Sequence, residues 1–265
     1  MIAGARIVRL SSLVSSSAVS PVVSRQYSRL FVGFVLGWFV LDRVATRMHS
    51  LYGEAGSFVA AATVSLLILV EMALFGEAPK AIPRVLGLTL PAARGLGVAV
   101  ALSLPLLAFY PIFAAVTDSE LVLRPGWLWL LPGLFLQGGV AEETLFRGYL
   151  FGHLRRTRPF WRAALLSMPP FLVVHLMMFT YMDAAVATAA TLLAISISFP
   201  LARLYDLAGR TIWAPAIVHF VIQGSVKVIV PAEGKQMALG IAWMALCLVV
   251  PWVVFAPPKS RQNSV

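Results

Sequence analysis

The sequence predicts an all-α fold, specifically a polytopic transmembrane helical bundle. Hydrophobic residues make up 60% of the 265 residues, charged residues make up only 12%, and the mean hydropathy is +0.87. Soluble domains carry roughly 25% charged residues. The apolar residues also gather in runs of about 20, the length that a helix needs to cross a hydrocarbon core about 30 Å thick.

Eight segments are apolar and long enough to be predicted as membrane helices. The first is the least apolar, because Asp42, Arg43 and Arg47 follow its apolar part, so a tilted or interfacial helix is the alternative there. Glycines and prolines within the apolar runs are interpreted as kinks and loop ends. In order, the segments are Leu30–Arg47, Ser57–Phe75, Gly95–Val116, Trp127–Leu154, Trp161–Phe179, Asp183–Leu201, Ile212–Val230 and Met237–Phe255.

Basic residues predict the orientation of these segments. With the N-terminus in the cytoplasm, fifteen of the 21 Lys and Arg fall in cytoplasmic segments and five in outer ones, while six of the eleven acids fall outside. Cytoplasmic loops of membrane proteins are enriched in Lys and Arg. We therefore expect both termini in the cytoplasm. Because the basic residues are scattered among helix ends, the net charge of +10 does not indicate a nucleic-acid partner.

The fourth segment contains three ionisable residues, Glu142, Glu143 and Arg147. Such residues inside a membrane helix are expensive and are functional by default. Glu143 and Arg147 are at i and i+4, so they can form an ion pair on one helix face. Glu142 is rotated by about 100° and has no cation of its own on the helix, which suits a general base. The alternative is a solvated cluster at a wet helix end.

Two histidines lie in the fifth and seventh segments, His175 and His219. At 1.5 Å per residue from the nearest cytoplasmic arginines, Glu142 and His175 lie about 20 Å deep and His219 about 14 Å deep. We therefore expect a carboxylate and two imidazoles to meet in the cytoplasmic half of the membrane. Pro169 and Pro170, just before Phe171, predict a kink that could also open a path for substrate and water.

Gln223 follows His219 by four residues, so both side chains are expected on one face of the seventh segment. A carboxylate with one imidazole can bind and deprotonate water. A second imidazole and an amide can donate hydrogen bonds to a developing oxyanion. Those groups suffice for peptide hydrolysis without a covalent intermediate, and none of them is a Ser or Cys nucleophile.

These motifs resemble those of the CPBP (CAAX protease and bacteriocin-processing) intramembrane proteases, glutamic endopeptidases with E-E-x-x-x-R, F-x-x-x-H and H-x-x-x-N/D on separate membrane helices. The resemblance covers roughly Gly95 to Val230, and it implies a peptide hydrolase that needs no cofactor or metal. It also implies that Glu142 and His175 activate water, that His219 and Gln223 line the oxyanion site, and that Glu143, Arg147 and Phe171 support the site or hold substrate. The matching residues are Glu142-Glu143 to Arg147, Phe171 to His175, and His219 to Gln223.

Gln223 departs from the Asn or Asp of that pattern. The amide donor is kept but extended by one methylene, and a misplacement of about 1 Å can cost on the order of a hundredfold in rate. A non-catalytic membrane scaffold of the same fold is therefore an alternative. A metal-dependent protease that uses Glu142, His175 and His219 is a second one, and a transporter is a third.

The resemblance and the composition together predict three regions. Residues 1–29 form a basic, Ser- and Arg-rich segment, residues 30–255 the transmembrane domain with a catalytic core at 95–230, and residues 256–265 a polar tail. The expected partners are the lipid bilayer and a membrane-associated or prenylated protein substrate. We expect a bacterial inner membrane. An organelle membrane is the alternative, because residues 1–29 also resemble a transit peptide.

Overall fold

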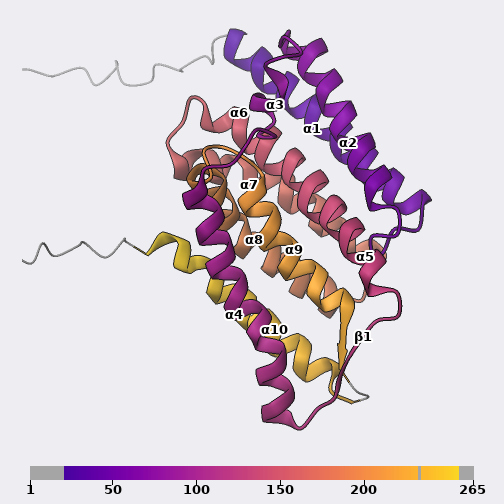
Figure 1. Cartoon of the computed structure of the whole chain (residues 1–265). Coiled ribbons are helices and arrows are strands. Elements are labelled where there is room, and N and C mark those ends of the chain that lie inside the picture. Colours follow the sequence, from indigo (N-terminus) through magenta and orange to yellow (C-terminus); the bar gives the residue numbers. More distant parts are fainter. Residues whose placement is uncertain (1–20, 232–233, 257–265) are drawn as a thin grey trace, which may run out of the picture.

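The elements follow one another as helices that run mostly along a common direction (Figure 1). The computed structural model describes residues 21–231 and 234–256. In chain order the elements are α1 (Pro21–Arg47), α2 (Gly56–Val70), the π-helix η1 (Glu71–Phe75), α3 (Ile82–Val85), α4 (Ala93–Thr117), β1 (Leu121–Leu123), α5 (Trp127–Leu134), the π-helices η2 (Phe135–Ala141) and η3 (Thr144–Phe151), α6 (Gly152–Arg155), α7 (Phe160–Leu176), the 3-10 helix η4 (Met177–Thr180), α8 (Ala184–Leu207), α9 (Trp213–Val228), β2 (Ile229–Pro231), α10 (Gln236–Val249) and the 3-10 helix η5 (Val250–Phe255).

The predicted all-α class is confirmed, and helices cover all eight predicted segments. Five helices of the described part are long and apolar enough to cross a membrane, and they correspond to the second, third, fifth, sixth and eighth predicted segments. The remaining three are α1, the stretch from α5 to α6, and α9, which has only 16 residues. The count of eight spans and the cytoplasmic side of both termini therefore stay predictions. The five helices are Gly56–Phe75, Ala93–Thr117, Phe160–Thr180, Ala184–Leu207 and Gln236–Phe255.

The stretch from η2 to α6 lies at the centre of the bundle. Every residue from Gly138 to Leu154 is buried except Glu142. It packs against α1 and α2 on one side and against α7 and α9 on others. Because this stretch carries the two glutamates of the predicted site, the fold places them in the protein interior.

Glycines allow two contacts between elements of the bundle to be very close. A Cβ on Gly56, at the start of α2, would lie 1.9 Å from the carbonyl oxygen of Gly133 in α5. A Cβ on Gly148 in η3 would lie 2.2 Å from the carbonyl oxygen of Leu86. Side chains cannot occupy those positions, so α2 packs against α5, and η3 packs against Leu86, with backbone against backbone.

A short antiparallel ribbon joins β1 and β2, with Leu121 opposite Pro231 and Leu123 opposite Ile229. This corrects the predicted seventh helix, which was expected to continue to Val230. The helix ends at Val228, and Ile229 is extended, with φ −94° and ψ 118°. The β-branched side chains of Ile229 and Val230, and the proline that follows them, favour this extended backbone.

The start of α1 and the end of η5 both lie near the segment that joins α6 to α7. The Arg158 guanidinium lies 5.0 Å from the Tyr27 ring centroid, and the rings of Trp161 and Phe255 stack at 5.2 Å. The helix α1 begins at Pro21, nine residues before the predicted Leu30 and inside the expected N-terminal segment. Residues 1–20 of that segment, and 257–265 of the expected tail, lie outside the described residues.

Candidate active site

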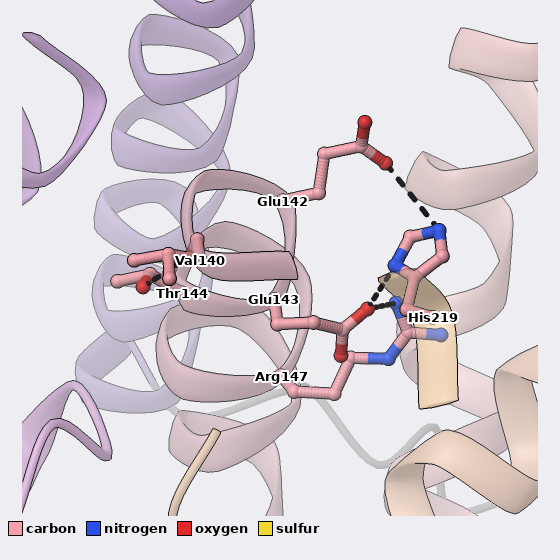
Figure 2. A network of polar contacts seen from close by, with 6 residues as sticks. All are labelled: Val140, Glu142, Glu143, Thr144, Arg147 and His219. Atoms are coloured by element: carbon pink, nitrogen blue, oxygen red, sulfur yellow. Dashed lines mark hydrogen bonds and ion pairs between the residues drawn. The ribbon is translucent and has the colours of Figure 1, made fainter. Parts of the chain in front are cut away.

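Glu142 and Glu143 lie at the junction of two π-helical stretches, since η2 ends at Ala141 and η3 begins at Thr144. π-Turns within helices occur frequently at functional sites. Both carboxylates extend toward His219 on the neighbouring helix α9, whereas Thr144 points the other way and donates a hydrogen bond to the Val140 carbonyl oxygen at 2.7 Å (Figure 2).

Glu143 accepts hydrogen bonds from two residues through a single oxygen. Its Oε1 lies 2.9 Å from Nη1 of Arg147 and 2.6 Å from Nδ1 of His219 (Figure 2). The three side chains are 0%, 2% and 2% exposed, respectively, so this group is shielded from the surroundings. The predicted ion pair between Glu143 and Arg147 is present in the structure. The contact to His219 also fixes the orientation of the imidazole ring, which a histidine needs for a defined role.

Glu142 approaches the other nitrogen of the same ring. Its Oε2 lies 3.8 Å from Nε2 of His219 (Figure 2). The Glu142 side chain is 19% exposed, whereas that of Glu143 is fully buried. Of the two carboxylates, Glu142 is therefore the one that water and a substrate can reach.

His175 on α7 occupies a separate position. Its Nδ1 lies 2.9 Å from the carbonyl oxygen of Phe171, and its ring packs at 4.5 Å against the Phe171 ring. Phe171 in turn lies 5.2 Å from the Arg147 guanidinium. Among the described residues, His175 makes no hydrogen bond or ion pair with Glu142 or His219. The structure thus brings Glu142 and His219 together, and it links His175 to them only through Phe171 and Arg147.

Gln223 lies one turn beyond His219 and contacts the turn that precedes Glu142. A Cβ on Gly138 would lie 3.0 Å from Oε1 of Gln223. Gly138 and Glu142 are at i and i+4 in the same stretch. The glycine leaves space for the longer side chain that departs from the family pattern, so Gln223 fits without displacing the carboxylate stretch.

Lys227 is a charged residue near the site that the sequence motifs did not indicate. It follows Gln223 by four residues and His219 by eight, so the three share one face of α9. Lys227 and Glu142 are near enough for their charges to interact. The repeated spacing of four along an otherwise apolar helix was the signal that could have identified it.

A second buried carboxylate–imidazole pair was also missed. Nε2 of His153 lies 2.7 Å from Oε1 of Glu71, and both side chains are almost fully buried. The rings of Phe75 and Tyr149 pack against His153 at 4.4 and 5.2 Å. Glu71 at the end of an apolar run was the available signal, because an ionisable residue at membrane depth calls for a partner.

No group of three or more His, Cys, Asp and Glu side chains in the described ranges is arranged to hold a metal ion. Glu142 and His219 approach each other, but His175, the third ligand of the metal alternative, points to the Phe171 carbonyl instead.

One family model matches the chain over residues 124–225, that of the Rce1-like type II CAAX prenyl endopeptidases. Comparisons with curated proteins and with solved structures found no match. The matched range contains both glutamates, both histidines and Gln223, and it coincides with the central stretch and the helices around it. At the family level the match supports an integral membrane endopeptidase that acts on a protein substrate in the bilayer. The resemblance is thereby confirmed over residues 124–225, which match the Rce1-like type II CAAX prenyl endopeptidase model, consistent with the CPBP family.

Proposed function

We propose that the chain is an intramembrane endopeptidase that cleaves a peptide bond of a membrane-associated protein with a water molecule activated by Glu142. The arrangement around His219 carries this proposal. Glu143 holds Nδ1 at 2.6 Å, and Nε2 faces the partly exposed Glu142 at 3.8 Å. At this separation, one water can lie about 2.8 Å from both the carboxylate and the imidazole nitrogen.

In the proposed reaction, Glu142 accepts a proton from water while the water oxygen bonds to the scissile carbonyl carbon. The carbonyl oxygen becomes an oxyanion, which accepts hydrogen bonds from the Gln223 amide and from Nε2–H of His219 in its imidazolium form, whose Nδ1–H donates to Glu143. Collapse of this intermediate breaks the carbon–nitrogen bond, and the proton on Glu142 passes to the leaving amine. No covalent enzyme intermediate is needed.

Glu143 and Arg147 act as positioning residues in this scheme. Glu143 accepts the Nδ1–H of His219, so the ring presents Nε2 to the reaction. Arg147 balances the charge of Glu143, because a buried carboxylate without a cation is costly.

His175 is assigned to the opposite wall of the site. When its Nδ1–H donates to the Phe171 carbonyl, Nε2 is left as a free acceptor that can hold the attacking water. This role requires His175 and Glu142 to share that water when substrate is bound.

The test is comparative proteomics of membrane fractions from cells that carry the wild type or Glu142→Gln, read as protein termini that vanish in the variant. Loss of a general base lowers the rate by about 10²- to 10⁴-fold. The matched control is Glu120→Gln, which changes an exposed glutamate outside the matched range. An unchanged set of termini in Glu142→Gln, with the protein present at normal amounts, would contradict the proposal.

Two alternatives have distinct outcomes. A scaffold of the same fold keeps its cellular phenotype in Glu142→Gln. The departure from the family pattern at Gln223 is the reason to test this alternative. A metal-dependent protease loses activity with chelators and regains it with added zinc, whereas the proposed mechanism is insensitive to both. The proposal also includes a prenylated substrate and a bacterial inner membrane, with an organelle membrane as the alternative. Cleavage of substrate peptides with and without the prenyl group tests the first of these points.

A further inference from the structure

A large groove on the outside of the bundle is separate from the proposed catalytic site. It has a volume of about 880 Å³ and lies between α4, the start of α7, the end of α8 and η5. The helices α4 and η5 lie side by side there, on the flank away from α1 and α2 (Figure 1). A volume of this size is within the range of ligand sites, roughly 300–1,000 Å³.

The groove is charged at one end and apolar along its length. Arg94 on α4 and Arg203 on α8 both line it. Neither arginine forms a hydrogen bond or an ion pair with any residue in the ranges 21–231 and 234–256. Elsewhere at this end of the bundle, Arg155 and Arg156 are paired with Asp206 and Glu77 at 2.9 and 3.5 Å. Two unpaired guanidinium groups in one groove favour an anion, since arginine binds phosphate with two parallel hydrogen bonds.

The apolar part continues from Arg94 along a single face of α4. Val98, Ala101 and Pro105 follow at helical spacing and line the groove, and Val253 of η5 lines the facing wall. From Arg94 to Pro105 this face extends about 16 Å at 1.5 Å per residue. Since these positions lie on a membrane helix, the length of the groove runs into the hydrocarbon layer.

The packing of α4 against α8 places both arginines on the same groove. Gly95 lets α4 cross α8 closely, because a Cβ there would lie 2.4 Å from Cα of Ala208. The Ala92 N–H donates to the carbonyl oxygen of Ala208 at 2.9 Å. Arg94 immediately precedes Gly95 at this crossing, and Arg203 lies five residues before Ala208 on α8.

We propose that this groove binds one acidic phospholipid, with its phosphate on Arg94 and Arg203 and an acyl chain along Val98, Ala101 and Pro105. The ligand must combine an anion with an apolar chain, as the groove does. The same groove is lined by Trp161 and Phe255, the kind of aromatic residues that gather at the membrane interface. Basic pockets between membrane helices bind anionic headgroups in this manner.

The test is the thermal unfolding of the purified full-length protein in detergent, titrated with phosphatidylglycerol. Phosphatidylcholine with the same acyl chains and soluble glycerol phosphate are the two comparison probes. We expect phosphatidylglycerol alone to raise the unfolding temperature at low micromolar to millimolar amounts, since a ligand of the folded state stabilises it. An equal rise with phosphatidylcholine, or with glycerol phosphate, overturns the proposal.

Variants separate the site from general surface charge. Arg94→Gln/Arg203→Gln should need roughly thirtyfold more phosphatidylglycerol for the same shift, on the basis of about 1 kcal/mol for each arginine. Arg25→Gln/Arg162→Gln removes two exposed arginines outside the groove and should leave the titration unchanged. Equal weakening in both double variants overturns the proposal.

A third variant keeps both charges and fills the groove. Ala101→Phe should also weaken the response to phosphatidylglycerol, and an unchanged response would overturn the predicted path of the chain. This variant carries the test if the double arginine variant does not fold. Glu142→Gln should respond like the wild type, so the lipid site and the proposed peptidase activity fail or succeed independently.

Discussion

At the scale of single residues, Glu143 is the most heavily used side chain of the site, because one oxygen serves both Arg147 and His219. We expect Glu143→Ala to lower the free energy of unfolding by about 3–5 kcal/mol, since it leaves a buried guanidinium without its anion. Denaturation of the purified protein in mixed micelles measures this loss. Glu142→Ala is the control, with a much smaller expected loss, because Glu142 is partly exposed and has no close ion pair. Similar losses in the two variants would contradict the different roles assigned to them.

Gly138 and Gln223 give a second prediction at this scale. We expect Gly138→Ala to push the Gln223 amide away from Glu142 and to lower peptidase activity by about 10- to 100-fold, because the new Cβ would be 3.0 Å from Oε1. Cleavage of the substrate identified by proteomics measures the effect. Gly240→Ala is the matched control, since a Cβ there meets nothing within 4 Å.

The double variant Gly138→Ala/Gln223→Asn sharpens that prediction. The shorter asparagine removes the clash with the new Cβ, so activity should recover relative to Gly138→Ala alone. If both single variants are inactive and the double variant is no better, then the space at Gly138 does not serve Gln223.

The contacts among the candidate site residues were predictable from the sequence only in part. The i, i+4 spacing was sufficient to predict the pair of Glu143 and Arg147, which the structure contains. An α-helical rotation of about 100° separates Glu142 from Glu143. Both carboxylates nevertheless approach His219, because each lies near a different nitrogen of its imidazole ring and because the two glutamates lie between two π-helical stretches. Residue spacing along separate helices predicts how deep each side chain lies in the membrane, but not the direction in which it faces. The sequence therefore could not predict that Glu142 pairs with His219 rather than with His175.

At the scale of secondary-structure elements, close contacts between helices depend on glycine. We expect Gly56→Val to destabilise the protein by about 1–3 kcal/mol or more, because α2 and α5 have to separate to admit the side chain. Thermal unfolding in detergent measures the loss. Gly97→Val on α4 is the control, since its position opens onto free space. Equal stability of both variants would show that the crossing of α2 and α5 tolerates a wider separation.

Helix boundaries and interruptions were the least predictable features of the elements. Apolar runs predicted where helices lie, but the π-helical stretches at residues 135–141 and 144–151 leave no mark on hydropathy. The β1–β2 ribbon was also missed, since Ile229 and Val230 are as apolar as the helix before them and the pairing partner lies more than a hundred residues earlier. Its extended backbone could have been inferred from Pro231.

At the scale of the whole molecule, the predicted topology places opposite ends of the bundle on opposite sides of the membrane. We expect a single cysteine at Thr157→Cys to react with an impermeant thiol reagent from the cytoplasmic side and one at Glu120→Cys to react from the outer side. Cys247→Ala provides the background, because Cys247 is the only cysteine of the chain and is buried. Lys80→Cys should behave like Thr157→Cys. Labelling of positions 157 and 120 from the same side would contradict the arrangement of spans.

The ribbon has a consequence for how a substrate could enter. It connects the loop before α5 to the end of α9, and Arg124 reinforces it with hydrogen bonds from its N–H to the Val228 carbonyl at 2.8 Å and from Nε to the Lys227 carbonyl at 2.9 Å. Backbone hydrogen bonds thus join the helices that carry Glu142 and His219 at the end of the bundle where the ribbon lies. If these two helices move apart, the joined end acts as the hinge and the gap opens at the opposite end. A polypeptide would then reach the proposed catalytic water from the end of the bundle that bears Arg155 and Arg158.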